Sequence, residues 1–281
     1  MTAEAAGRTR ATTRHGEPTG RPAVTLTRVL ASEWTKVAGL GWTLWVPLAT
    51  VLVAAVMPLG LGLFARPGDG TTAAGLVVSG VVLAQLGTLV LGVLVGTSDF
   101  STSTAATTYT AVPRRLPVLA AQVGLTTGLA LVSSLAALGA SVLVTTAQSG
   151  RTGLMLDLAA DGGTARALAG VVLYLTAVTL LGLGLGALVR RPAGALVAGV
   201  ALLVVADRVL AANPGRVADT VRALLPGVGT RLVETDARLA VTETASLGPH
   251  LGTWGAGLVL AAWVGGVLVA AGARLRRGDV T

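Results

Sequence analysis

One polar stretch decides the fold: Ser98-Asp-Phe-Ser-Thr-Ser-Thr-Ala-Ala-Thr-Thr-Tyr-Thr-Ala-Val-Pro-Arg-Arg-Leu-Pro-Val-Leu-Ala-Ala-Gln122. A long apolar run stands on each side of it, and its adjacent arginines are Arg114 and Arg115. Charged side chains are costly in hydrocarbon. The stretch therefore lies outside the membrane and joins two helices that cross it. An ordinary solvated turn between two spans has the same composition, so residue types alone leave a further role for this stretch open.

The composition of the whole chain agrees with a membrane protein. The chain has 281 residues, of which 53% are apolar and 12% are charged, whereas a soluble domain carries about 25% charged residues. Because cysteine is absent, the chain has no disulfide framework, thiolate metal site or cysteine nucleophile. The two histidines, His15 and His250, are isolated, which argues against a metal site. The net charge of +8 comes from arginines between apolar runs, a placement that indicates membrane topology rather than nucleic-acid binding.

Six stretches reach the ~20 mostly apolar residues that a membrane span needs. Their approximate bounds are 41–64, 74–97, 117–146, 164–189, 192–212 and 251–273. Pro47 and Pro58 predict a kink in the first span. Only Arg190 and Arg191 separate the fourth span from the fifth, which leaves no room for a domain between them. The predicted fold class is an all-α integral membrane protein, a six-transmembrane-helix bundle.

The segments outside the spans have distinct patterns. Residues 1–21 are polar and lack the apolar core of a signal peptide, so we expect a disordered tail. Residues 22–40 repeat apolar residues at helical spacing and predict an N-terminal amphipathic helix in the membrane interface; the alternative is that they simply extend the first span. Residues 98–116 form the loop already quoted, and residues 274–281 a short C-terminal tail.

A long loop, 207–250, precedes the last span. Asn213 followed by Pro214 predicts a helix start, and Val217, Val221, Leu224 and Leu225 then share one face. This pattern is typical of an amphipathic helix at the outer membrane surface or one that re-enters the membrane. A second helical stretch, 230–240, carries alternating charges, and we expect it to be a solvated surface helix.

The basic residues predict the orientation. With the sides numbered alternately from the N-terminus, the first side holds thirteen basic and five acidic residues, and the other side holds eight of each. The thirteen are Arg8, Arg10, Arg14, Arg21, Arg28, Lys36, Arg114, Arg115, Arg190, Arg191, Arg274, Arg276 and Arg277. Cytoplasmic loops carry the excess of Lys and Arg, so we expect both termini and the 98–116 loop to lie in the cytoplasm.

Small and polar residues within the spans suggest how the helices pack. Gly92 and Gly96 lie four residues apart in the second span, and Gly182 and Gly186 in the fourth. Such spacing lets helix backbones approach closely, and we favour packing within one subunit over dimerisation. Gln85 is the strongest polar residue inside a span and is a candidate pathway residue. No charged residue lies at the centre of a span, which counts against ion coupling.

The chain lacks its own site for a nucleotide of the P-loop type. That motif needs a lysine to reach the phosphates, and the single lysine, Lys36, lies outside any such motif. The Gly-Leu-Gly-Leu-Gly sequence at residues 182–186 lies within a membrane helix, so it is not a phosphate-binding loop. Neither histidine is inside a span, which disfavours an intramembrane hydrolase.

Four segments carry a resemblance to a known family. They read Ala31-Ser-Glu-Trp-Thr-Lys36, Gly92-Val-Leu-Val-Gly-Thr-Ser-Asp-Phe-Ser-Thr102, Ala111-Val-Pro-Arg-Arg-Leu-Pro-Val-Leu-Ala-Ala121 and Leu224-Leu-Pro-Gly-Val-Gly229. Together they resemble permease subunits of ABC transporters, the type 2 permease family, as found in actinobacteria. The chain departs from the family at Asp99-Phe100, where members often carry Glu-Tyr, and at Gln122, where Lys is common. Members also often have Gly and then Arg where residues 103–106 read Ser-Thr-Ala-Ala. These departures suggest a weaker partner contact or a divergent branch.

The resemblance implies a function and partners. It implies an ATP-driven exporter in a bacterial plasma membrane, with two permease subunits, identical or different, around one pathway. It also implies separate ATP-binding subunits on the cytoplasmic face, docked on the N-terminal helix and the loop after the second span. The chain itself is then neither an enzyme nor a cofactor-binding protein. The candidate coupling residues are Glu33, Lys36, Asp99, Ser101, Thr102, Arg114 and Arg115.

Two questions remain open within this reading. Asp99, Ser101 and Thr102 can cap a short helix in the loop, and Arg114 and Arg115 either pair with the ATPase or anchor the loop to anionic lipid. The alternative function is a non-transporting membrane component that serves in assembly or sensing.

Overall fold

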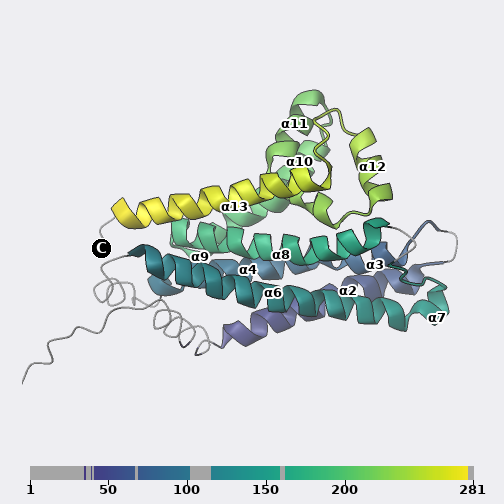
Figure 1. Ribbon diagram of the computed structural model, residues 1–281, viewed down its shortest axis with the longest axis horizontal. Helices are drawn as coiled ribbons and strands as arrows, with labels where there is room; N and C mark the ends of the chain where they lie inside the picture. The colour runs from purple at the N-terminus through teal and green to yellow at the C-terminus, as the bar shows by residue number, and fades with distance from the viewer. Residues whose placement is uncertain are drawn as a thin grey trace, which may run out of the picture.

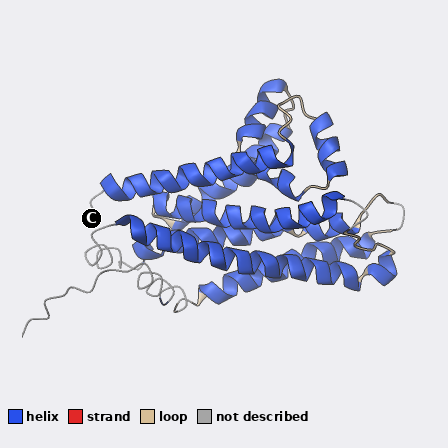
Figure 2. Cartoon of the chain, viewed as in Figure 1, coloured by secondary structure: helices blue, strands red, loops and turns tan. Residues whose placement is uncertain are grey.

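The computed structural model describes residues 35, 39, 41–66, 69–101, 115–158 and 162–277. Helices are the only regular elements in these ranges, and six of them are long and apolar enough to cross a membrane (Figure 2). The predicted all-α six-helix membrane bundle is confirmed, and the chain is a multi-pass membrane protein. The predictions for the tail 1–21, nearly all of the helix 22–40, residues 102–114 and residues 278–281 lie outside the described residues.

Four spans are single helices and two are interrupted. The single helices are α2 (Trp42–Phe64), α6 (Arg115–Ala147), α8 (Gly162–Val189) and α13 (Gly252–Arg277). The second span consists of α3 (Ala73–Ser79) and α4 (Val81–Ser101), which meet at Gly80. The fifth consists of α9 (Pro192–Val200), the π-helix η1 (Ala201–Val205) and α10 (Ala206–Ala211). The sequence predicted the bounds of the spans closely but neither interruption.

Helix α8 lies at the centre of the bundle and packs against α4, α6 and α13 (Figure 1). Its residues Tyr174, Leu175, Val178 and Leu181 are fully buried. At its end, Arg190 adopts a left-handed conformation, with φ of 62°, and its N–H donates to the Gly186 carbonyl at 2.8 Å. This closes the helix and allows α9 to begin two residues later, at Pro192. The two-residue connection predicted between these spans is therefore present.

Helix α2 lies at the edge of the bundle, and α6 satisfies the carbonyl that a proline leaves free. Pro58 has no N–H to donate to the Ala54 carbonyl four residues before it. The Ser141 hydroxyl of α6 donates to that carbonyl instead, at 3.0 Å. Near the end of α2, Arg151 of α7 (Ser149–Thr152) donates to the Gly62 carbonyl at 2.7 Å. In hydrocarbon every backbone polar group needs such a partner.

Residues 212–251 form a cap between the fifth and sixth spans, with three short helices. These are α11 (Arg216–Leu224), the 3₁₀ helix η2 (Pro226–Val233) and α12 (Asp236–Thr244). The predicted loop began at 207, but α10 continues to Ala211. The predicted helix start at Asn213 is wrong, because the Asn213 side chain donates back to the Val209 carbonyl and closes α10. The predicted helix 230–240 has other bounds in the structure, since residues up to Val233 belong to η2 and α12 runs from Asp236 to Thr244.

The cap lies beside α13. Figure 1 shows α11 and α12, together with α10, over the first half of that helix. The indole N–H of Trp263 donates to the Leu224 carbonyl at 2.8 Å, although Trp263 lies ~16 Å along the axis from the start of α13. Six residues of η2 are buried: Pro226, Gly227, Val228, Gly229, Leu232 and Val233. Backbone at membrane depth that is not α-helical needs such cover by protein. Of the two alternatives for this loop, the geometry favours the re-entrant one for η2.

Candidate functional site

The four glycines predicted to mediate helix packing meet at one contact between α4 and α8. A Cβ added at Gly92 would overlap the carbonyl oxygen of Thr179, and one at Gly96 would overlap that of Leu183. From the other side, a Cβ at Gly182 would lie 2.6 Å from the Leu89 carbonyl oxygen, and one at Gly186 2.8 Å from that of Val93. The two backbones touch within one chain, so this glycine face is occupied and is not free to contact another subunit.

Gln85, the candidate pathway residue, is held inside the bundle. Its side chain is buried, and its Oε1 accepts a hydrogen bond of 2.6 Å from the Tyr174 hydroxyl of α8. Its Nε2 donates to the Val82 carbonyl at 3.0 Å. Gln85 therefore links α4 to α8 in this conformation and lines no open pathway.

Tyr174 is the partner that sequence reasoning missed. A signal was available, because Tyr174 is one of only two tyrosines and lies in the middle of a span. A phenol there needs a hydrogen-bond partner within the protein, and Gln85 is a strong acceptor at similar depth.

Helices α6 and α8 carry further hydroxyl groups that are buried or half-buried. Thr127 and Ser133 donate to backbone carbonyls of their own helix, at 2.7 and 3.1 Å. Among the described residues, the hydroxyl oxygens of Thr126, Ser134 and Thr176 are buried without a hydrogen-bond partner. The interior is therefore mildly polar. A change of helix packing can give these three hydroxyl groups hydrogen-bond partners.

The candidate coupling residues lie at, or beyond, the described ends of two helices. Asp99 and Ser101 are in the last turn of α4, and Arg115 is the first residue of α6. The loop predicted at 98–116 is therefore shorter, because both helices extend into it. Glu33, Lys36, Thr102 and Arg114 lie outside the described residues, so their proposed roles stay predictions.

Helix α11 exposes its apolar face. Val217 is 79% exposed and Leu224 59% exposed, whereas Asp219 on the opposite face is buried. The Asp219 carboxylate accepts the Leu247 N–H at 2.9 Å, which holds the end of the cap against α11. An apolar face turned outward is unfavourable in water but suits the membrane interface.

Ion pairs attach the cap to α8 and to α10. Arg166, near the start of α8, donates to the Asp236 carboxylate at 2.8 Å and to the Glu234 carbonyl at 2.7 Å. Arg222 donates to Asp207 at 3.0 Å. Because Arg166 contacts two residues of the cap, it fixes where α12 begins.

Glu234, whose carbonyl oxygen accepts from Arg166, has a side-chain carboxyl group with a raised pKa. Burial raises the pKa of Glu234 above its ordinary value, while the nearby Arg238 and Arg231 and a hydrogen bond from Thr242 oppose the shift. One of its oxygens, Oε2, is buried without a hydrogen-bond partner. A proton on this carboxyl is therefore held more tightly than on a solvated glutamate.

Comparison with known proteins adds no family assignment. No protein-family model matches the chain, and no curated protein is significantly similar to it. Within the described residues, no group of three or more His, Asp or Glu side chains is arranged to hold a metal ion. The functional reading therefore depends on the geometry and on the resemblance of the four segments.

Proposed function

We propose that the chain is the membrane-spanning permease subunit of an ATP-driven ABC exporter, which forms the pathway together with a second permease subunit. A separate ATP-binding subunit supplies the energy. The observation that carries the proposal is the connection 102–114. It joins α4, which ends at Ser101, to α6, which begins at Arg115, and the segments 92–102 and 111–121 on its two sides resemble the type 2 permease family.

The packing supports a mechanical role for that connection. A force applied to it acts on α4, and the backbone contact of Gly92 and Gly96 with α8 transmits the force to the centre of the bundle. Since α8 also packs against α6 and α13, a movement of α4 repositions most of the helices. Such a rigid link is what an ATPase closing on one face of a membrane requires.

The proposal includes a bacterial plasma membrane with both termini in the cytoplasm. By sequence, the excess of basic residues falls on the side that holds both termini and the 98–116 loop. Reporter fusions after Arg277 and at Arg114 are expected to report cytoplasm, and fusions at Arg66 and Glu234 the exterior. A cytoplasmic signal at Glu234 contradicts this orientation.

Purification from native membranes tests the partner. We expect a tagged chain to retain a protein with a Walker A motif, and the reconstituted complex to couple ATP hydrolysis to transport. The isolated chain is expected to show no ATPase activity. A stable complex without any ATPase favours the assembly or sensor alternative.

The double substitution Arg114→Glu, Arg115→Glu tests the connection itself. We expect normal insertion, because eleven basic residues remain on that side, together with loss of ATPase retention or of coupled transport. The matched control is Arg10→Glu, Arg14→Glu, which makes the same change of charge in the N-terminal tail. Wild-type retention and transport in the loop variant would mean that these arginines only set topology.

A further inference from the structure

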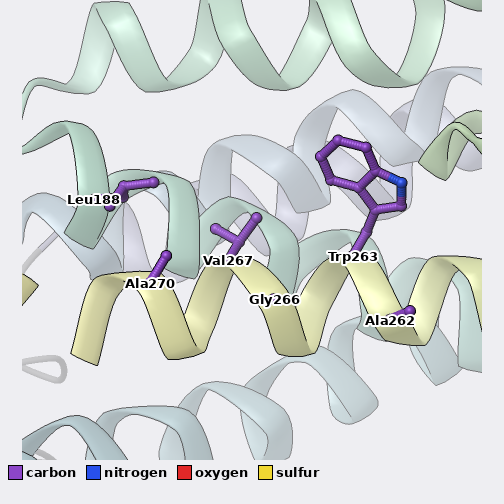
Figure 3. Close-up of a pocket in the computed structure, with 6 residues that line it drawn as sticks. All are labelled: Leu188, Ala262, Trp263, Gly266, Val267 and Ala270. Carbon is purple, nitrogen blue, oxygen red and sulfur yellow. The ribbon is translucent and has the colours of Figure 1, made fainter. Parts of the chain in front are cut away.

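An apolar groove lies between α13 and the end of α8 (Figure 3). Its volume is about 330 Å³, and it is lined by Leu188, Ala262, Trp263, Gly266, Val267 and Ala270. The only polar side-chain atom among these is the indole nitrogen of Trp263, which is already bonded to the Leu224 carbonyl. The groove therefore offers apolar contact without a hydrogen-bonding group.

The two ends of the groove differ in chemistry. The Trp263 indole, fixed by its bond to the cap, forms one end. Arg274 stands at the other end, one turn beyond Ala270 on the same face of α13, and its guanidinium donates to the carbonyl of Leu188, a lining residue. Arg274 is exposed, and so is Arg191 in the turn that follows α8. A guanidinium has five N–H donors, so Arg274 retains donors for an anion.

The length of the groove matches one leaflet of a bilayer. Ala262 and Ala270 are eight residues apart, which is ~12 Å along a helix, and half of the hydrocarbon core is ~15 Å. The end of the groove at Arg274 lies where the apolar part of the α13 sequence ends. An apolar channel of this length with a cationic end has the dimensions and polarity of one acyl chain below a phosphate group.

We propose that this groove binds a single anionic phospholipid, with an acyl chain against Gly266 and Ala270 and its phosphate on Arg274. A helix of a second copy fits less well, because it would need contact along the full ~30 Å of a span and would bury the Arg274 guanidinium without an anion. Bidentate pairing between a guanidinium and a phosphate is strong. The proposal does not depend on a transport function.

Tryptophan fluorescence tests the site, because Trp263 lines it. Two single-tryptophan proteins are compared, one retaining Trp263 and one retaining Trp254, with the other four tryptophans changed to Phe. Trp254 lies on the same helix and is 66% exposed, so it reports ordinary lipid contact. Each protein is reconstituted in phosphatidylcholine vesicles that contain brominated phosphatidylglycerol or, at the same mole fraction, brominated phosphatidylcholine.

We expect Trp263 to prefer brominated phosphatidylglycerol about five-fold, the selectivity expected for one arginine near an anionic headgroup, and Trp254 to show no preference. Arg274→Gln should reduce the preference at Trp263 to about one. Gly266→Leu should remove the preferential quenching by filling the groove. A Cβ at Gly266 meets no other atom, so the fold should tolerate the change.

Gly265→Leu is the matched control, because Gly265 is equally open but does not line the groove. It should leave the preference unchanged. If Gly266→Leu does not fold, Ala270→Leu fills the same groove one turn away. Equal quenching by the two lipids, or equal effects of the Gly265 and Gly266 variants, would overturn the proposal. Quenching by neither lipid, with an altered oligomeric state in Gly266→Leu, would mean that a second copy occupies the groove.

Discussion

Helices α2 and α8 have nearly the same mean hydropathy, 2.1 and 2.2, but α2 lies at the edge of the bundle and α8 at its centre. In the most apolar window of each, 22% of the residues of α2 and 67% of those of α8 are buried. Apolarity does not separate the two, because lipid is as apolar as a leucine side chain and gives helices no hydrophobic reason to associate. Backbone contact through glycine and polar side-chain links place α8 at the centre. Helix α2 is held instead by hydrogen bonds that Ser141 and Arg151 donate to its backbone carbonyls.

The largest expected effect comes from closing the glycine contact of α8. In Gly92→Ala the new methyl group overlaps the Thr179 carbonyl, so the helices must separate, at a cost of about 3 kcal/mol of unfolding free energy. Thermal unfolding in detergent measures the loss. Gly124→Ala is the control, because a Cβ at Gly124 meets nothing. Equal stability of the two variants would mean that close backbone approach does not hold α8 in place.

The next effect concerns the polar link between α4 and α8. Tyr174→Phe leaves the Oε1 of Gln85 without its donor in a buried site, which should cost about 1–2 kcal/mol. Combining it with Gln85→Leu completes a double-mutant cycle in the same unfolding assay. We expect the double variant to lose less than the sum of the single losses. Strict additivity would show that the hydrogen bond contributes nothing.

A smaller effect is expected for the attachment of α2. Ser141→Ala removes the donor to the Ala54 carbonyl and should cost about 1 kcal/mol. In Pro58→Ala the new N–H can take that carbonyl, so Ser141→Ala should then cost little in the Pro58→Ala background. An undiminished cost in that background would contradict the role assigned to Ser141. The measurement is the melting temperature of the four proteins of this cycle.

The smallest effect is expected at Glu234 of the cap, which is joined to α8 and not to α2. The folded state holds the Glu234 proton more tightly than the unfolded state, so this contribution to stability is full below the ordinary carboxyl pKa. It is lost as pH rises through the raised pKa of the folded state. Glu234→Gln should flatten this part of the pH dependence. An identical pH profile for the variant would refute the buried, proton-retaining environment.

The sequence predicted the spans but not which of them is central. Runs of apolar residues mark the bounds of α2 and α8 equally well, and the arginine turn at Arg190 could be read directly. The glycine spacing indicated a close contact but not its partner. Gln85 was visible as a polar residue within a span, yet its role depends on Tyr174, 89 positions away, and spacing along one helix cannot reveal a contact between two helices.

The interruptions and the depth of the cap depend on tertiary contacts. The boundary between α3 and α4 at Gly80 occurs where a Cβ would overlap the Ala54 carbonyl of α2, a contact that the local sequence does not show. Helical propensity at 230–240 is overridden because η2 packs its glycines against other helices: a Cβ at Gly229 would lie 2.6 Å from the Leu260 side chain. The sequence left open whether the 207–250 loop re-enters the membrane. An amphipathic pattern indicates that a helix lies between polar and apolar surroundings, but it does not give the depth of that helix in the membrane.

The two-residue turn after α8 has a consequence for biosynthesis. It joins α9 directly to α8. In the most apolar window of each span, 17% of the residues are buried in the fifth span, which begins with α9, and 67% in α8, the largest share of the six. Neither helix can be inserted, withdrawn or inverted without the other, because no slack separates them. Inverting the pair would carry the guanidinium groups of Arg190 and Arg191 through the hydrocarbon, at about 2.5–3.5 kcal/mol each on the insertion scale. Once the α8–α9 hairpin has entered the membrane, we therefore expect it to keep its orientation, because turning it over is slow.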